Sequence, residues 1–341
     1  MKFNRYDSIE NTYRTPFVDQ VQHYLLPEEP FYVQEKIHGA NFSIWWTKDG
    51  IIKCGSRNKF LEEGTNFYNW EHVLEKYRPN IQTVLQEIEK ERGGSTPTEV
   101  IFYGELYGGS YPHDKVKPVD QAQQVQSKVY YCPHNEFHGF DIKVDGSYLP
   151  VDEVNSLYEM GGIPYAHTLW EGTLDTCLKY LNEFITTLPH MHNCPPIKEN
   201  ICEGVIIKPK RTIYLPNGLR VIFKNKNKRF VERTHTKHHK LDRKNMENNE
   251  IPNKVYESII EYVTENRLRN ILSKIGEITH RDFGQILRDM KQDVQEDFDK
   301  DHISEWEPLN VSDTKYVHKR LNNYIATLIK ENLEEIVSGT F

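Results

Sequence analysis

One lysine of this chain stands where it could act as a nucleophile. Lys36 follows an apolar segment that ends at Val33 and lies in the run Glu35-Lys36-Ile37-His38-Gly39-Ala40-Asn41. A lysine amine attacks an electrophile only when burial or nearby positive charge lowers the pKa of its ammonium group. We expect Lys36 at the end of a strand, where Gly39 lets the backbone approach a ligand closely. Taken alone, the pattern K-x-x-G fits a surface hairpin better, so other residues must decide.

Two further clusters lie on segments rich in β-branched and aromatic residues, a composition typical of strands. Glu105 ends the apolar run 99–105, and a carboxylate in this position can hold a ribose hydroxyl or a metal ion. Phe140 lies within 136–144, where its ring could stack on a base, and strand alternation places Asp141 on the opposite face. An aromatic residue in the middle of a strand is also typical of a protein core.

The last two clusters combine a carboxylate with several lysines. Glu203 opens the run 203–209, in which strand alternation places Lys208 on the face opposite Glu203 unless a bulge intervenes. Lys224 and Lys226 are two residues apart on an apolar strand, so they share a face. Two ammonium groups there suit a polyphosphate and favour the neutral form of an amine beside them. Each cluster alone is weak evidence, but their order along the chain is specific.

In this order the motifs resemble those of the covalent nucleotidyltransferases, which include polynucleotide ligases and RNA-capping enzymes. The matching patterns are K-x-x-G, F-Y-G-E, F-D-I, E-G-x-x-x-K-P and K-x-K. The runs 6–11, 35–43 and 266–278 are similar to the RNA ligase 2 family, whose members seal nicks in double-stranded RNA. The C-terminal run is not shared with capping enzymes, and the resemblance covers nearly the whole chain.

The resemblance implies an ATP-dependent RNA ligase that uses Mg²⁺ or Mn²⁺. Lys36 would attack the α-phosphate of ATP and form a lysyl-AMP intermediate, with release of diphosphate. The AMP would pass to the 5′-phosphate of one RNA strand, and the 3′-hydroxyl of a neighbouring strand would displace it at a nick in the duplex. Each step is an in-line displacement at phosphorus, in which positioning and charge neutralisation supply most of the rate.

Roles for other residues are implied by the same resemblance. Glu35 would contact the adenine end, Phe140 would stack on adenine, and Glu105 would bind the ribose. Glu203 and, through water, Asn41 would hold the metal ion. The nucleotide-binding residues implied in this way are Glu35, Ile37, Asn41, Arg57, Glu105, Phe140, Glu203, Lys224 and Lys226. The residues implied in the RNA steps are His38, Lys208, Arg267 and Asp293.

Other interpretations compete with this one. The run 143–146 fits the K-x-D-G nucleophile pattern of DNA ligases, but Asp-Gly after a strand is a common hairpin turn and no F-Y-G-E-like cluster follows Lys143. An ATP-dependent DNA ligase or a capping guanylyltransferase would carry a C-terminal β-barrel, whereas this C-terminus has helical spacing. A non-catalytic duplex-RNA-binding protein would not need Lys36 together with Glu105, Glu203 and Lys226.

A zinc site is a separate hypothesis, built from Cys132, His134 and His138 with His190, His192 and Cys194. The spacings are irregular and the chain has no C-x-x-C pair, so surface histidines and free cysteines are the favoured interpretation. The five cysteines are scattered and odd in number. They indicate free thiols in a reducing compartment, the cytoplasm or alternatively the nucleus.

Charge is unevenly distributed along the chain. The net charge is −7, but residues 208–244 carry 13 Lys and Arg against Glu232 and Asp242, a local balance of +11 that leaves −18 elsewhere. Such a basic segment is typical of phosphate binding, although a solvated linker can have the same composition.

The chain has no run of about 18 apolar residues, and its start lacks the apolar core of a signal peptide. We therefore expect an intracellular monomer without a membrane span.

These features predict an α+β protein of two domains. The resemblance implies that residues 1–235 form an antiparallel-sheet-rich nucleotidyltransferase domain of the ATP-grasp-like ligase type. Composition and spacing predict a polar linker over 236–253 and a small all-helical domain over 254–341. Strand-like runs lie at 31–37, 41–46, 99–105, 136–144, 203–209 and 219–226. Helical spacing is found at 69–91, 172–188, 255–275, 283–298 and 313–336. No role is assigned to the insert 107–137 or to the His-rich segment 235–239.

Overall fold

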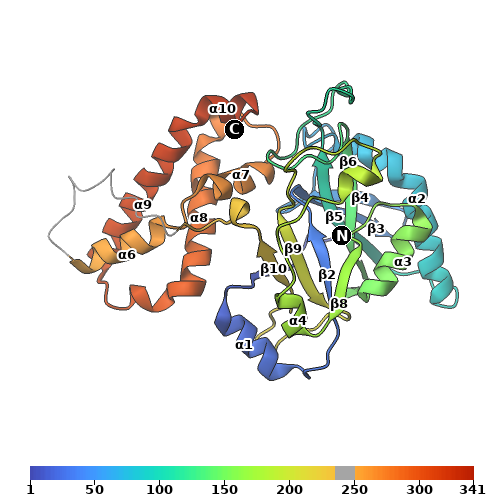
Figure 1. The fold of residues 1–341 in the computed structure, drawn as a ribbon, viewed down its shortest axis with the longest axis horizontal. Coiled ribbons are helices and arrows are strands. Elements are labelled where there is room, and N and C mark those ends of the chain that lie inside the picture. The colour runs from blue at the N-terminus through green and yellow to red at the C-terminus, as the bar shows by residue number, and fades with distance from the viewer. Residues whose placement is uncertain (235–249) are drawn as a thin grey trace. The chain divides into compact units, whose positions relative to one another are not determined.

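The computed structural model describes residues 1–234 and 250–341, which form two compact units, Met1–Arg229 and Phe230–Phe341 (Figure 1). The predicted linker 236–253 falls mostly outside the described residues, and its last residues, from Glu250 onward, belong to a helix of the second unit. The predicted domain limits therefore stay a prediction.

The first unit contains two five-stranded sheets. The first sheet has the strand order β1-β10-β9-β2-β8, and the second sheet has the order β4-β3-β5-β6-β7. Only β1 and β10 pair in parallel among the named strands of the described chain, which confirms the antiparallel-rich prediction. The strands are β1 Glu10–Asn11, β2 Phe31–Lys36, β3 Ala40–Thr47, β4 Ile52–Ser56, β5 Glu99–Gly108, β6 Asn135–Val144, β7 Ser147–Tyr148, β8 Thr168–Gly172, β9 Gly204–Pro209 and β10 Phe223–Lys226.

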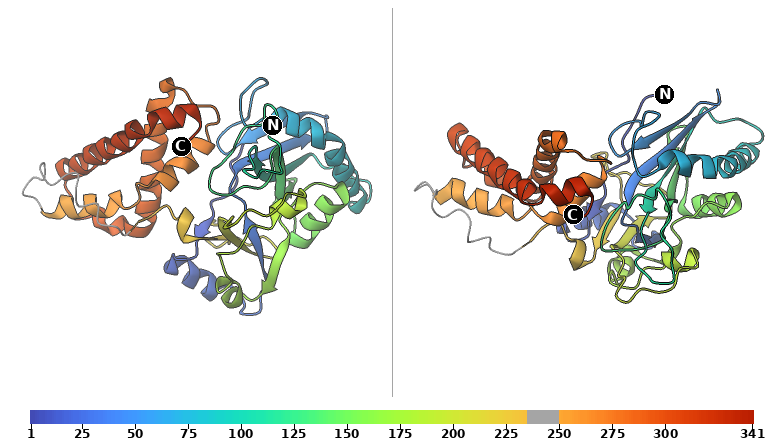
Figure 2. Two further views of the ribbon diagram at one scale, coloured as in Figure 1. Left: turned by 45° about the horizontal axis from the view of Figure 1, so that its top comes forward. Right: turned by 90° about the horizontal axis from the view of Figure 1, so that it is seen from above.

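Helices cover the outer face of each sheet (Figures 1 and 2). Alternation along the strands sends one set of apolar side chains outward to these helices and leaves the other set facing the opposite sheet. On the first sheet, α1 (Thr15–Tyr24) and α4 (Leu174–Leu178) bury Val33, Val205, Ile207 and Phe223. On the second sheet, α2 (Trp70–Glu91) and α3 (Val151–Gly161) bury Phe42, Ile44, Val100 and Phe102.

The inner faces of the two sheets are joined by a buried ion cluster. Asp141 on β6 accepts hydrogen bonds from Lys208 Nζ on β9, at 2.7 Å, and from Arg220 in the chain that leads into β10, at 2.9 Å. All three side chains are at most 3% exposed. Burial alone would raise the pKa of Asp141, but Arg220 and Lys208 outweigh it and lower this pKa to about 2. The carboxylate is therefore held ionised between two cations.

The second unit is entirely helical in its described part, as the spacing predicts. Its helices are α6 Glu250–Ile260, α7 Glu265–Ser273, α8 Phe283–His302, α9 Val311–Glu331 and α10 Leu333–Ser338. The predicted helical run 255–275 divides after Ile260, because the Thr264 side chain caps α7 by accepting the Arg267 N–H at 3.1 Å. One apolar core joins these helices.

The helix predicted over 172–188 is wrong. Only Leu174–Leu178 and the short α5, Leu188–Met191, are helical there. The chain between them bonds to its neighbours instead of to itself: the Asn182 amide donates to Lys226 O at 3.0 Å, and Thr186 N donates to Asn200 O at 2.9 Å. Apolar spacing alone could not reveal these bonds, because their partners are distant in the sequence.

Among the residues that the structure describes, no helix combines the length and the apolar composition needed to cross a membrane.

The buried cluster around Asp141 predicts a large stability effect. Asp141→Ala leaves Lys208 and Arg220 buried without their anion, which should lower the free energy of unfolding by about 3 to 5 kcal/mol. Asp152→Ala is the matched control, because Asp152 pairs with Lys210 at 2.8 Å but is half exposed, and should cost at most about 1 kcal/mol. Urea unfolding measures both. Equal losses for the two variants would show that the cluster does not hold the sheets together.

Candidate active site

The candidate site lies on the inner faces of the two sheets. In the register of the first sheet, Lys36 on β2 pairs with Gly204 on β9, and Gly204 pairs with Lys226 on β10. Cα partners in adjacent strands share a face, so Lys36 and Lys226 project from the same face on either side of a residue without a side chain. Lys224 pairs with Ile206 and lies two residues further along that face. The lysines of the predicted cluster thus come from β2 and β10, which lie on either side of β9.

Glu203 occupies the space between these lysines. Its Oε2 lies 2.8 Å from Lys36 Nζ, and its Oε1 lies 3.0 Å from Lys226 Nζ. The ring Nδ1 of His38 lies 3.3 Å from the same Oε2. Burial opposes ionisation of Glu203, but Lys36 and Lys226 outweigh it and hold its pKa well below the ordinary value. One buried carboxylate therefore fixes the positions of two lysines and a histidine.

Gly204 makes this position of Glu203 possible. Its φ is +147°, and a Cβ atom there would lie 2.1 Å from Asn225 O. The backbone turn at Gly204 interrupts strand alternation, so Glu203 reaches the inner face. Lys208 pairs with Tyr32 in the same register in which Gly204 pairs with Lys36, and therefore shares that face. The expectation that Lys208 lies on the face opposite Glu203 is wrong. It required unbroken strand alternation between the two residues, and the turn at Gly204 interrupts that alternation.

The second sheet contributes a carboxylate and an amide. Asn41 on β3 and Glu105 on β5 are Cα partners and lie side by side on the inner face. Neither side chain makes a hydrogen bond to another residue of the described ranges 1–234 and 250–341. Burial raises the pKa of Glu105 to about 8, and Lys36 opposes this rise. Both groups are available to a ligand. Nearby, Arg57 donates to Tyr6 O at 2.5 Å.

Phe140 and Ile206 supply apolar surface to the same site. Both are partly exposed and belong to one cluster between the sheets. A β-bulge places Phe140 there, since Tyr103 pairs with Asp141 while Gly104 pairs with Gly139, leaving Phe140 as the additional residue. For the same reason Asp141 also faces the first sheet, and its predicted place on the opposite face is wrong.

Three of the predicted site residues, Glu35, Ile37 and Lys208, have buried side chains. The Glu35 carboxylate is buried and accepts hydrogen bonds from both hydroxyls of Thr186 and Thr187 and from Thr187 N, at 3.0 Å. It thus binds a loop, which argues against a carboxylate contact with adenine. Ile37 is a buried apolar side chain, so only its backbone could reach a nucleotide. Lys208 is sequestered by Asp141, which argues against a direct contact with RNA.

Lys143, the rival nucleophile, lies in a hairpin. It pairs with Tyr148 across the β6–β7 turn, in which Asp145 and Gly146 have φ values of +47° and +87°. The hairpin interpretation of Asp145-Gly146 is therefore confirmed. The Lys143 ammonium lies 4.9 Å from the centre of the Tyr148 ring.

Arg267 and Asp293 lie in the helical unit and contact each other. Arg267 is 1% exposed, donates to Tyr262 O at 2.9 Å, and forms a second ion pair with Asp297 at 2.9 Å. It connects α7 with α8, so it cannot form part of an exposed ligation surface. For Arg267, the predicted role in the RNA steps could only be exerted through the positions of these helices. The Asp293 side chain is 30% exposed, and its role in the RNA steps stays a prediction.

Sequence reasoning missed several residues that support the site. Tyr131 Oη accepts the His38 backbone N–H at 2.9 Å, and Thr186 and Thr187 bind Glu35. All three lie in loops without a motif, so the sequence carried no signal for them. Ile206 lay inside the E-G-x-x-x-K-P motif and could have been found from its position on the lysine face.

A family model described as RNA ligase matches residues 29–226, more than half of the chain. The chain belongs to the RNA ligase family. A second model, described as T4 RNA ligase 2 C-terminal, matches residues 246–327 and confirms the resemblance to the RNA ligase 2 family. The predicted enzyme class, an RNA ligase, and the predicted substrate class, RNA, are thereby confirmed. The two antiparallel-rich sheets and the helical second unit confirm the predicted fold class, α+β.

Similar proteins include two RNA-editing ligases from mitochondria of Trypanosoma brucei brucei. RNA-editing ligase 2 is 27% identical over 377 residues, which cover 95% of this chain and 88% of that protein. RNA-editing ligase 1 is 26% identical over 206 residues, covering 52% of this chain and 44% of the relative. Among solved structures, the Naegleria gruberi RNA ligase with PPi has a TM-score of 0.45 and 18% identity, covering 67% of this chain and 57% of that chain.

The raised pKa of Glu105 predicts a pH-dependent stability. Between the ordinary pKa of 4.5 and about 8, the folded protein keeps a proton that the unfolded chain has lost, so wild-type stability falls as pH rises through this window. Glu105→Gln should therefore have the higher Tm, by a margin that grows up to about pH 8 and is constant above it. Calorimetry with Glu99→Gln, on the same strand, as control measures this. A margin independent of pH would contradict the raised pKa of Glu105.

Proposed function

We propose that this protein is an ATP-dependent RNA ligase that joins 3′-hydroxyl and 5′-phosphate ends at nicks in duplex RNA, with Lys36 as the nucleophile. The observation that carries the proposal is the position of Lys36 Nζ, 2.8 Å from Glu203 and on the same face as Lys224 and Lys226. Opposite them, Glu105 makes no hydrogen bond within the described residues. The two inner faces thus offer cations for phosphates and an acceptor for a ribose.

The ATP would lie between the sheets. Adenine would lie against the apolar surface of the Phe140 ring and Ile206. The ribose hydroxyls would donate to Glu105, whose ionisation above about pH 8 strengthens such a bond. Lys224 and Lys226 would neutralise the α-phosphate on which the Lys36 amine attacks, while diphosphate leaves in line. Because Lys36 contacts Glu203, that ion pair must break before the amine can attack.

The residues of the site fit a divalent metal ion that contacts Asn41 through water. Asn41 has a free amide oxygen beside Glu105, and Glu203 is a carboxylate already shared between two lysines and His38. Mg²⁺ usually keeps several water ligands, so contact with Asn41 through water suits this site. Such an ion would supply charge neutralisation for the ATP phosphates. A mutant of the Naegleria gruberi RNA ligase has been solved with ATP and Mn.

Duplex RNA is the favoured substrate over a DNA duplex. Recognition would use 2′-hydroxyls and the A-form shape beside the nick. The basic composition of 208–244 supports phosphate binding, and its described part includes the exposed Lys228 and Arg229. An ATP-dependent DNA ligase and a non-catalytic RNA-binding protein are the alternatives that the experiment below separates.

Sealing of defined nicks tests the proposal. Duplexes with a 3′-hydroxyl/5′-phosphate nick are prepared with RNA or DNA on each side of the nick and on the bridging strand. We expect ATP- and Mg²⁺-dependent joining of the all-RNA duplex, and less joining when the nucleotides flanking the nick are DNA. Lys226→Ala should reduce the rate by about 100-fold, whereas Lys53→Ala, a variant on β4 away from the site, should retain it.

Two results would contradict the proposal. Equal or better joining of DNA nicks would favour a DNA ligase, and binding of the RNA duplex without any joining would favour a non-catalytic binding protein.

A further inference from the structure

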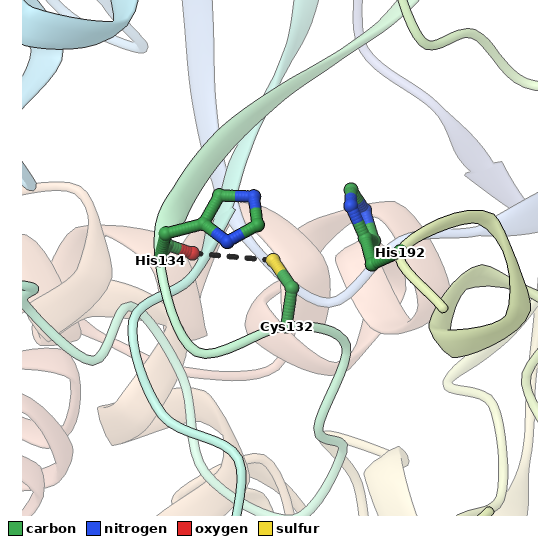
Figure 3. A group of neighbouring side chains, drawn as sticks. All are labelled: Cys132, His134 and His192. Atoms are coloured by element: carbon green, nitrogen blue, oxygen red, sulfur yellow. Dashed lines mark hydrogen bonds between the residues drawn. The ribbon is translucent and has the colours of Figure 1, made fainter. Parts of the chain in front are cut away.

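Two loops of the first unit carry cysteine and histidine in mirrored order. Cys132 and His134 come directly before β6, and His192 and Cys194 come directly after α5. The structure brings one ligand atom from each of Cys132, His134 and His192 within 4.8 Å of the others. Figure 3 shows the three side chains turned toward a common space, with the Cys132 sulfur between the two histidines. The sequence spacing of these cysteines and histidines favours surface histidines and free cysteines without a metal ion. The fold nevertheless places Cys132, His134 and His192 together.

We infer that Cys132, His134 and His192 bind a Zn²⁺ ion. Zinc prefers thiolate and imidazole ligands in a tetrahedral arrangement. With ordinary zinc–sulfur and zinc–nitrogen bond lengths, neighbouring ligand atoms in such a site are separated by roughly 3.5 Å. The present separations, all within 4.8 Å, therefore need to contract by at most about 1.3 Å. The inference is independent of the proposed ligase reaction.

The outer partners of the two histidines support this assignment. His134 Nε2 lies 3.4 Å from Glu136 Oε2, and His192 Nε2 lies 2.7 Å from the Tyr107 hydroxyl. Glu136 is in turn hydrogen-bonded to Lys76 and to the Phe137 N–H, at 2.9 Å for the latter. Metal-bound histidines commonly donate their second ring N–H to a carboxylate or another oxygen, which orients the ring. Here both rings keep Nδ1 for the metal.

The backbone around the cluster is fitted closely. Gly108 has a φ of +82°, and a Cβ atom there would lie 2.6 Å from Cys132 Sγ and 2.3 Å from His134 O. The Cys132 thiol itself donates to His134 O at 3.2 Å. The Tyr111 hydroxyl donates to Pro195 O at 2.5 Å. This is a second hydrogen bond, besides that of Tyr107 with His192, between the insert 107–137 and the loop after α5. Cys194 or water would complete a tetrahedral set.

The ion would give a function to the insert 107–137. It would join this insert to the loop that follows α5, and both loops support the catalytic strand. Tyr131, next to Cys132, accepts the His38 N–H at 2.9 Å, and Thr187, just before α5, donates to Glu35 at 2.8 Å. Zinc binding should therefore stabilise the first unit and fix the loops beside Lys36, without touching the substrate.

Metal content of the full-length protein tests the inference. The protein is purified without a polyhistidine tag, treated with a chelating resin, supplied with ZnSO₄ and dialysed. We expect equimolar zinc by plasma mass spectrometry, a Tm that falls on treatment with EDTA and recovers with Zn²⁺, and a thiolate-to-cobalt absorption band after replacement by Co²⁺. Cys132→Ala and His192→Ala should lose the zinc, and Cys132→Ala should lose the band.

Matched controls separate this cluster from other metal-binding residues. Cys54→Ala removes a buried cysteine of β4, and His190→Ala removes an exposed histidine two residues before His192. A variant in which His235, His238 and His239 are all alanine removes the His-rich segment of the sequence. All three should keep equimolar zinc and the cobalt band. If the wild-type protein binds little zinc and shows no cobalt–thiolate band, or if Cys132→Ala and His192→Ala keep their zinc, the inference is wrong; the wild-type spectra decide the matter even if a variant does not fold.

Discussion

The catalytic half of this protein depends on one buried carboxylate that lies among three cationic or ionisable side chains. Glu203 contacts Lys36 and His38 from one segment of the chain and Lys226 from another. Removing a carboxylate from water is costly, and only close cations compensate for that cost. The sheet register must therefore bring Lys36 and Lys226 to either side of Gly204, and Gly204 must lack a side chain so that Glu203 can turn inward. The ion pair with Glu203 also fixes the position of Lys36, the proposed nucleophile, and under that proposal it must break before the amine attacks.

The two-sheet arrangement explains why this network can act on a nucleotide. The inner faces carry opposite chemistry: lysines on the first sheet, and Asn41, Glu105 and the Phe140 ring on the second. The Asp141 cluster holds the sheets together at one end. Lys208, for which the resemblance implied a role in the RNA steps, therefore serves structure there together with Arg220. At the other end, loops that contain Tyr131 and Thr187 hold His38 and Glu35. Sites of this kind gain from such preorganisation, because little movement is then needed in the reaction.

The sequence predicted the components of the site better than their surroundings. The strands around Lys36, Glu105, Phe140 and Lys226 follow from local composition, and the order of the motifs was enough to identify the family. Two backbone irregularities were not predictable, the turn at Gly204 and the bulge at Phe140, because each depends on pairing with a distant strand. These two features reversed the expected faces of Lys208 and Asp141. The helix expected over 172–188 was not predictable for the same reason, since Asn182 in this segment bonds to β10 and Thr186 bonds to Asn200.

The identity of the nucleophile is the central claim, and locating a covalent AMP group tests it most directly. The protein is incubated with labelled ATP and Mg²⁺, digested, and analysed by tandem mass spectrometry. The account predicts a single AMP adduct on the peptide that contains Lys36, with no adduct on Lys36→Ala and an unchanged adduct on Lys143→Ala. An adduct on Lys143, or one that persists on the Lys36→Ala protein, would contradict it.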